Sequence, residues 1–431
     1  MYRILLISAL TVLAFIASIL FFPQIPIAKG RRMKIYPLIP LTGALCLLLT
    51  GDVQWGLIMD SFTEDSSVNP IRILVLFFSM TIFSLLLEQS GFFVHISGVI
   101  LRRAGQSQYK IFFSLYAVIS LLTVFTSNDI VILTFTPFIC YFCRAAKIDP
   151  IPYLIMEFVA ANTWSLFLLI GNPTNIYISG AFDISFFEYV SVMALPTIAA
   201  GLTSLATMFL LFRKKLRGEI RNDIDVEPVR DRVLMWVSLV HLVACVLLLS
   251  VAQYIGFEMW LISLALALSA VICSTICLVI RRRRVECVGM AIIHMPFENI
   301  PFIVGMFVIV LALEGSGITA TVAALFQSDE SVFSYGFFSF LFCNVLNNIP
   351  MSVLFSKILS LGGTDGQIFA TVIGSNIGAF LTPVGALAGI MWLNLLKKNK
   401  VTLSARRFVL FGGLIGIPAL CASLAVLELI F

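Results

Sequence analysis

Polar residues interrupt long apolar runs at matching places in the two halves of this chain, and their side chains suit a binding site. Ser127-Asn128-Asp129 separates two apolar arms, and Gly171-Asn172-Pro173-Thr174-Asn175 interrupts an apolar helix. The second half has Asn347-Asn348-Ile349-Pro350 and Thr382-Pro383-Val384-Gly385. Lipid offers unpaired backbone no partner, so irregular backbone at membrane depth must line a protein cavity. Paired interruptions of this kind indicate a solute site.

Asp129 is the most informative of these residues. An acid at membrane depth is costly and is a functional candidate by default. Scarce water favours the neutral acid, so such a group can take a proton on one side of a membrane and release it on the other. The alternative is that Asp129 only caps the apolar arm that begins at Ile130, because Asp is a favoured N-cap. The two roles are compatible.

The uncharged candidates share amide or hydroxyl groups that could replace water around a small polar solute. They are Ser127, Asn128, Asn162, Asn172, Thr174, Asn175, Asn347, Asn348, Ser375, Asn376 and Thr382. Alternatively, they only satisfy backbone groups freed at the interruptions. We interpret Glu157 as an interfacial residue rather than a proton relay, because it lies near the start of its helix. Cys140 and Cys143 form a lone CxxC that fits packing better than metal binding, so we expect no metal and no cofactor.

The composition requires a membrane around these segments. Hydrophobic residues make up 60% of the chain and charged residues 12%, whereas soluble domains carry about 25% charge. We therefore expect an all-α polytopic protein with about ten transmembrane helices, two re-entrant hairpins and two broken helices. The hairpins are expected at 111–143 and 332–361, and the broken helices at 153–178 and 368–394. The first break should fall at Gly171–Asn175 and the second at Thr382–Gly385.

The two halves share one order of segments. Glu88-Gln89-Ser90-Gly91 matches Glu314-Gly315-Ser316-Gly317. We predict a first repeat at 1–212, a basic cytoplasmic linker at 213–232 and a second, inverted repeat at 233–431. If the basic loops are cytoplasmic, all of the Lys and Arg residues except Arg3, Arg72 and Lys357 fall on that side. Both termini are then external, and the hairpin tips at Asp129 and Asn348 should approach each other.

With these motifs placed, the chain resembles the ion transporter superfamily, and within it the arsenite efflux permease family. The similarity runs from about Leu38 to the C-terminus and includes the Asn-Asp and Asn-Asn-x-Pro tips. It implies two inverted repeats, two hairpins and a midplane site. Asn376 stands where the arsenite family carries an acid. Gly171-Asn172-Pro173-Thr174-Asn175 is more similar to the dicarboxylate and sodium–proton carriers of the wider superfamily.

The function implied by this resemblance is proton-coupled efflux of arsenite or antimonite across the cytoplasmic membrane, with Asp129 as the coupling residue. A sodium–proton antiporter, an organic or inorganic anion carrier and an ion channel remain alternatives. The chain has no Walker-type phosphate loop, so any ATP must be used by a partner subunit. We expect no enzyme, because no nucleophile–base pair or metal cluster lies at depth. Expected partners are a small polar or anionic solute, protons or sodium, and membrane lipid; an ATPase subunit and a second copy are further candidates, and nucleic acid is not.

Overall fold

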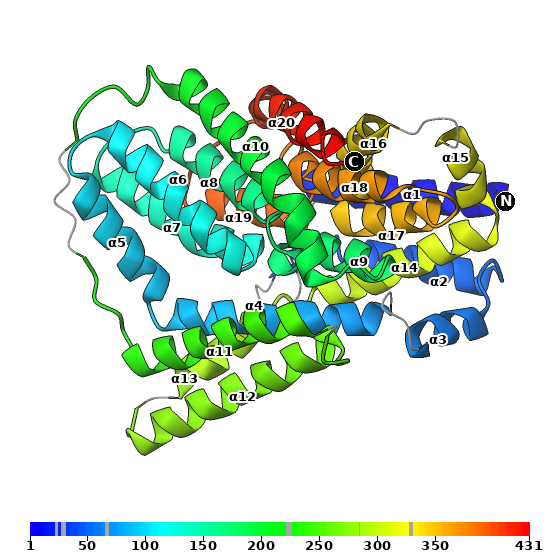
Figure 1. Cartoon of the computed structure of the whole chain (residues 1–431), viewed down its shortest axis with the longest axis horizontal. Helices are drawn as coiled ribbons and strands as arrows, with labels where there is room; N and C mark the ends of the chain where they lie inside the picture. Colours follow the sequence, from blue (N-terminus) through cyan, green and yellow to red (C-terminus); the bar gives the residue numbers. More distant parts are fainter. Residues whose placement is uncertain are drawn as a thin grey trace.

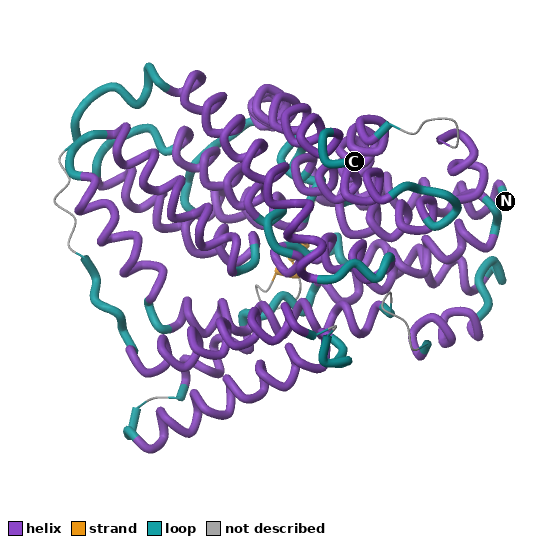
Figure 2. The backbone as a smooth tube through the Cα atoms, viewed as in Figure 1, coloured by secondary structure: helices purple, strands orange, loops and turns teal. Residues whose placement is uncertain are grey.

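Helices make up nearly all of the regular structure of this protein (Figures 1 and 2). One antiparallel pair of two-residue strands, β1 (Ile25–Pro26) and β2 (Arg32–Met33), completes the regular structure of the described chain. The predicted all-α class is confirmed. The computed structural model describes residues 1–21, 25–26, 32–64, 69–220, 226–252, 254–283, 285–326 and 331–431.

Within the described residues, seven helices are long and apolar enough to cross a membrane. They are α1 (Tyr2–Phe21), α4 (Pro70–Gln89), α6 (Gln108–Phe125), α10 (Phe186–Phe212), α11 (Arg232–Val251), α12 (Met259–Ile280) and α20 (Ala405–Glu428). An eighth span is formed if α14 (Asn299–Gly315) and α15 (Ile318–Phe326), which meet at a 72° bend, count as one. The expected number of about ten also included α2 (Leu38–Leu49) and the broken helices, whose separate pieces are shorter.

Three short helices connect these spans. They are α3 (Trp55–Thr63), α5 (Phe92–Ala104) and α13 (Glu286–Ile293). Each of them has fewer residues than a spanning helix needs.

Two helical hairpins stand where polar residues separate apolar arms. The first joins α6 to α7 (Asn128–Ala145), and the second joins α16 (Val332–Leu346) to α17 (Asn348–Leu359). Ser127 is the N-cap of α7, and its hydroxyl accepts a hydrogen bond from the Asp129 backbone N–H at 3.2 Å. The N-cap is therefore Ser127, and the alternative role of Asp129 as the cap is wrong.

Two helices are broken, one in each half. The first consists of α8 (Ile151–Trp164) and α9 (Pro173–Ala181), with a short 3-10 helix, η2 (Leu169–Gly171), between them. The second consists of α18 (Asp365–Gly378) and α19 (Leu387–Lys398). The first break lies earlier than the predicted Gly171–Asn175, because α9 already begins at Pro173. Proline lacks only a donor that the first helical position does not use, so it starts a helix readily.

The order of helices is the same in both halves. α4 to α10 and α14 to α20 each comprise a long helix, a short helix, a hairpin, a broken helix and a final span. Figure 1 shows α4 and α14 running in opposite directions, as an inverted repeat requires. α16 and α18 pack very closely: a Cβ on Gly374 would lie 1.9 Å from Ser339 Oγ and 2.2 Å from the Gly336 carbonyl oxygen.

Loops that carry basic residues are joined to one another. Lys215 Nζ pairs with Asp149 Oδ2 at 2.6 Å, and Arg144 Nη2 donates to the Asn399 carbonyl at 2.7 Å. These contacts connect the ends of α7, α10 and α19, which the sequence places on one side of the membrane.

The three basic residues assigned to the opposite side each pair with an acid. The pairs are Arg3–Asp52 at 2.7 Å, Arg72–Glu258 at 2.5 Å and Lys357–Glu314 at 3.2 Å. Each exceptional cation therefore has an acidic partner close by.

Candidate functional site

The tips of the two hairpins meet at a small buried space, which we call the tip cavity. Asp129 from the first hairpin and Asn348 from the second both line it, as predicted. Its other polar lining residues are Asn128, Asn172 and Asn299. The cavity volume of about 10 Å³ is roughly the room that one water molecule needs. The site is therefore closed in this conformation, and a solute requires it to widen.

Five helices begin at the tip cavity. Their first residues, all of which line it, are Asn128 of α7, Pro173 of α9, Asn299 of α14, Asn348 of α17 and Leu387 of α19. Each helix N-terminus carries a partial positive charge. Several of the first N–H groups already have partners: Thr174 N–H donates to Asn172 Oδ1 at 3.2 Å and Asn348 N–H to the Gly385 carbonyl at 2.9 Å. The helix ends therefore attract negative charge through their dipoles, whether it is on Asp129 or on a solute.

Asn376 lies at the centre of a hydrogen-bond network beside this cavity. Its Oδ1 accepts from Asn172 Nδ2 at 2.9 Å and from Ser165 Oγ at 3.1 Å. Its Nδ2 donates to Asn175 Oδ1 at 2.8 Å and to Thr174 Oγ1 at 3.3 Å. Because these partners belong to the first broken helix and Asn376 to the second, the amide connects the two halves of the molecule.

The same network explains where the first break falls. Asn175 Nδ2 donates to the carbonyls of Ser165 and Leu168 at 2.8 and 3.2 Å. These carbonyls lie where α8 has already ended, and the amide gives them partners. Asn162 lies one turn before this point and accepts from Asn128 Nδ2 at 3.2 Å through its Oδ1. Asn175 thus holds the interrupted backbone, and it does not line the tip cavity. The predicted site residues Asn162, Thr174 and Ser375 also lie outside the cavity lining, where their side chains join the surrounding hydrogen bonds.

The second break is fixed by Asn344, which the sequence analysis did not select. Asn344 Oδ1 accepts from both the N–H and the hydroxyl of Thr382, at 2.9 and 2.6 Å. Asn347 Nδ2 donates to the Val384 carbonyl at 2.9 Å. Asn347 has φ +77° and ψ 153°, a backbone region that is costly for any residue but glycine. Its buried Oδ1 has no hydrogen-bond partner in the described structure, so this tip retains an unused acceptor.

Asn299 is the cavity residue that sequence reasoning missed. A signal was present: the tripeptide Asn-Ile-Pro occurs at 299–301 and again at 348–350, and both asparagines line the tip cavity.

The interfacial interpretation of Glu157 is wrong. Its side chain is fully buried and accepts hydrogen bonds from Thr136 Oγ1 at 2.8 Å and Trp392 Nε1 at 3.2 Å.

Comparisons with known proteins place the chain among transporters. Residues 25–367 match the CitMHS family model, described as citrate transporter. An arsenical pump membrane protein of Escherichia coli is 27% identical over 376 residues, covering 82% of this chain and 85% of that protein. A putative arsenical pump membrane protein of Bacillus subtilis (strain 168) is 24% identical over 437 residues, covering 92% and 94%.

Solved structures share the fold. The YdaH transporter of Alcanivorax borkumensis superposes with a TM-score of 0.58 at 13% identity, covering 99% of this chain and 97% of that chain. Neisseria gonorrhoeae MtrF, reported with a class of antimetabolite efflux pumps, gives 0.58 at 14% identity, covering 99% and 94%. At such low identity these likenesses concern the fold alone.

Proposed function

We propose a function from this premise: the chain belongs to the CitMHS citrate transporter family, and it is an integral membrane transporter. The reaction that we propose is secondary active efflux of arsenite or antimonite across the cytoplasmic membrane, driven by protons moving inward. The arsenical pump membrane proteins of Escherichia coli and Bacillus subtilis support this choice of solute.

The observation that carries the proposal is one carboxylate among several amides at a closed cavity. Asp129 lies with Asn128, Asn172, Asn299 and Asn348 around the tip cavity. Arsenite and antimonite are neutral trihydroxy acids near neutral pH, and their hydroxyls suit amide donors and acceptors. Asp129 takes one proton when the site faces outward and releases it when the site faces inward. One neutral solute leaves for each proton that enters, so the exchange moves one positive charge inward.

A second candidate is an organic anion carrier. The five helix N-termini at the tip cavity favour a negatively charged solute, and the family description names citrate. In this alternative, a carboxylate of the solute replaces the Asp129 carboxylate at the positive helix ends while Asp129 is protonated. The two candidates differ in whether Asp129 or the solute carries the negative charge.

Flux into inside-out vesicles tests the proposal, because efflux then appears as uptake. The vesicles are given arsenite, antimonite, citrate or sodium, each with and without a pH gradient. We expect saturable arsenite and antimonite uptake that needs an acidic lumen and is lost in Asp129→Asn. Asp149→Asn is the matched control, since Asp149 pairs with Lys215 on the surface, away from the tip cavity.

The other outcomes of this assay each contradict the proposal. Citrate movement without arsenite movement favours the anion carrier, and sodium-driven pH change favours a sodium–proton antiporter. Flux that does not saturate and ignores the pH gradient indicates a channel.

We also propose the inverted-repeat arrangement, with the basic loops in the cytoplasm and both termini outside. The shared helix order and the opposed directions of α4 and α14 support it. The contacts among the basic loops and the three acid-paired exceptions support the sidedness.

A further inference from the structure

Cavities adjoin the tip cavity on both of its sides. Towards the cytoplasmic loops lies an inner cavity of about 30 Å³, lined by Lys34, Leu133, Glu298 and also by Asp129 and Asn299. The last two residues line the tip cavity as well, so the two spaces are neighbours. The inner cavity ends at an ion pair between Lys34 and Glu298.

On the other side of the tip cavity the lining becomes apolar. An apolar cavity of about 20 Å³ is lined by Leu74, Tyr177 and Phe307, and it shares Pro173 and Ile349 with the tip cavity. No charged residue lines it.

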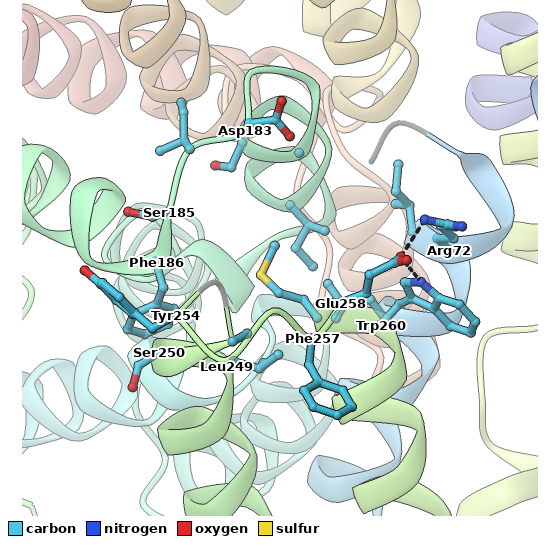
Figure 3. Close-up of a pocket in the computed structure, with 18 residues that line it drawn as sticks. Arg72, Asp183, Ser185, Phe186, Leu249, Ser250, Tyr254, Phe257, Glu258 and Trp260 are labelled. Carbon is cyan, nitrogen blue, oxygen red and sulfur yellow. Dashed lines mark hydrogen bonds and ion pairs between the residues drawn. The ribbon is translucent and has the colours of Figure 1, made fainter. Parts of the chain in front are cut away.

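Ile73 lines both this apolar cavity and a larger outer pocket of about 290 Å³, so the two spaces are neighbours. Figure 3 shows the outer pocket, where Glu258 contacts both Arg72 and Trp260, each at 2.5 Å. Asp183 lies across the pocket from this group. Arg72 and Glu258 stand at the starts of α4 and α12, on the side that the topology makes external.

Phe77 is the side chain that three of these four spaces have in common. It lines the inner cavity, the tip cavity and the apolar cavity, and only 5% of its surface is exposed. Phe77 lies in the middle of α4, which contacts α7, α9 and α14. Its ring therefore stands where the polar inner and tip cavities meet the apolar cavity.

We propose that the four cavities form one route for the solute, and that Phe77 is the barrier that divides this route in the closed state. The inference rests on the proposed function, because it concerns the path through that site. A coupled carrier must never be open to both sides at once, since protons would then cross without solute. An apolar constriction that excludes water closes such a path without a charge.

Phe77→Ala removes the ring and joins the tip cavity to the apolar cavity. Water can then reach Asp129 from both sides, and we expect protons to leak when no solute is present. Phe78→Ala is the matched control: Phe78 is the next residue on α4 and lines none of the four cavities. Its ring packs against Phe77 and Phe297 at 5.4 and 5.6 Å between centroids, so this variant removes a neighbouring ring and leaves the Phe77 ring in place.

In the test, purified protein is reconstituted into liposomes, a pH gradient is imposed without arsenite, and the decay of that gradient is followed. We expect faster decay for Phe77→Ala than for wild type, and wild-type decay for Phe78→Ala. Phe77→Val, which keeps part of the volume, should give an intermediate leak and serves if the alanine variant does not fold. Folded Phe77 variants that hold the gradient as tightly as Phe78→Ala would overturn the inference.

The assay separates this inference from the proposed function, because it uses no solute. A wild-type protein that moves no arsenite, with a Phe77→Ala variant that leaks, contradicts the solute and supports the barrier. Arsenite uptake by wild type without any leak in the Phe77 variants contradicts the barrier alone.

Discussion

In the tip cavity Asp129 is surrounded by partial charges, whereas the cation Lys34 lines the adjoining inner cavity with it. The residues that line the tip cavity with it include asparagines, a proline and apolar side chains, and none is basic. The five helix N-termini supply the only positive potential among these lining residues. Among the residues that line the tip cavity, only Asp129 can change its charge by taking up or releasing a proton.

Asp129→Asn should abolish the arsenite uptake that the pH gradient drives. The substitution keeps the size of the side chain and its ability to accept hydrogen bonds but removes the titrating group. Uptake by inside-out vesicles at several lumen pH values measures the effect.

Glu157→Gln is the control for Asp129→Asn, because Glu157 is also buried but accepts hydrogen bonds from Thr136 and Trp392. We expect it to keep the pH dependence of wild type. If instead Asp129→Asn retains that dependence and Glu157→Gln loses it, the proton is carried by Glu157.

Sequence reasoning found the interruptions but not their internal geometry. Polar residues within apolar runs are visible in any window, so both hairpin tips were located within a few residues. The first break was misplaced because its start depends on Asn175, ten positions along the chain, giving hydrogen bonds to the Ser165 and Leu168 carbonyls. Asn299 was missed because its signal, the tripeptide shared with 348–350, does not itself show that the start of α14 lies at the hairpin tips.

At the scale of elements, the contact between α16 and α18 should tolerate no added carbon. Gly374→Ala would place Cβ 2.2 Å from the Gly336 carbonyl, and backbone cannot easily move aside. We expect a loss of about 1–3 kcal/mol in the free energy of unfolding. Thermal unfolding in detergent measures it.

Gly289→Ala in α13 is the comparison, since its new Cβ would meet nothing within 4 Å. It should be neutral or slightly stabilising, because alanine favours helix. Equal melting temperatures for the two variants would contradict the packing argument.

The ion pair between Lys34 and Glu298 should act on transport rather than on stability. Both side chains are partly exposed, at 34% and 40%, so the pair contributes only about 0–1 kcal/mol to folding. Lys34→Glu should slow arsenite flux by placing two acids together at the end of the inner cavity, and adding Glu298→Lys should restore it. Vesicle uptake and melting temperature together measure this.

The ion pair Lys215–Asp149, on the same side of the protein, is the control for this charge exchange. Lys215→Glu should leave flux unchanged, because neither residue lines the cavities along the route. If Lys34→Glu combined with Glu298→Lys does not recover flux, although the single and double variants are folded, the importance of the Lys34–Glu298 contact is contradicted.

At the scale of the whole molecule, the sidedness predicts where the chain ends lie. Arg3, near the N-terminus, pairs with Asp52 on the side that carries few basic residues. Five basic residues lie before or at the start of α20, which places that start on the other side. The end of α20 then lies on the same side as Arg3. An epitope added after Phe431 should therefore be accessible to antibody in intact spheroplasts. Accessibility only after permeabilisation would reverse the proposed orientation.

The Asn376 network has a consequence for how the molecule moves. Broken helices are usually the parts that open most easily, yet here Asn175 donates to the freed carbonyls of Ser165 and Leu168 at 2.8 and 3.2 Å. Asn376, from the other half, hydrogen-bonds the side chains around this break at 2.8–3.1 Å. We expect backbone amides near 165–176 and 372–379 to be among the slowest to exchange hydrogen for deuterium. Slow exchange at these breaks would mean that α8, α9, α18 and α19 move together as one rigid body. Access to the site would then change at the outer surfaces of this body, while the hydrogen bonds at the two breaks stay formed.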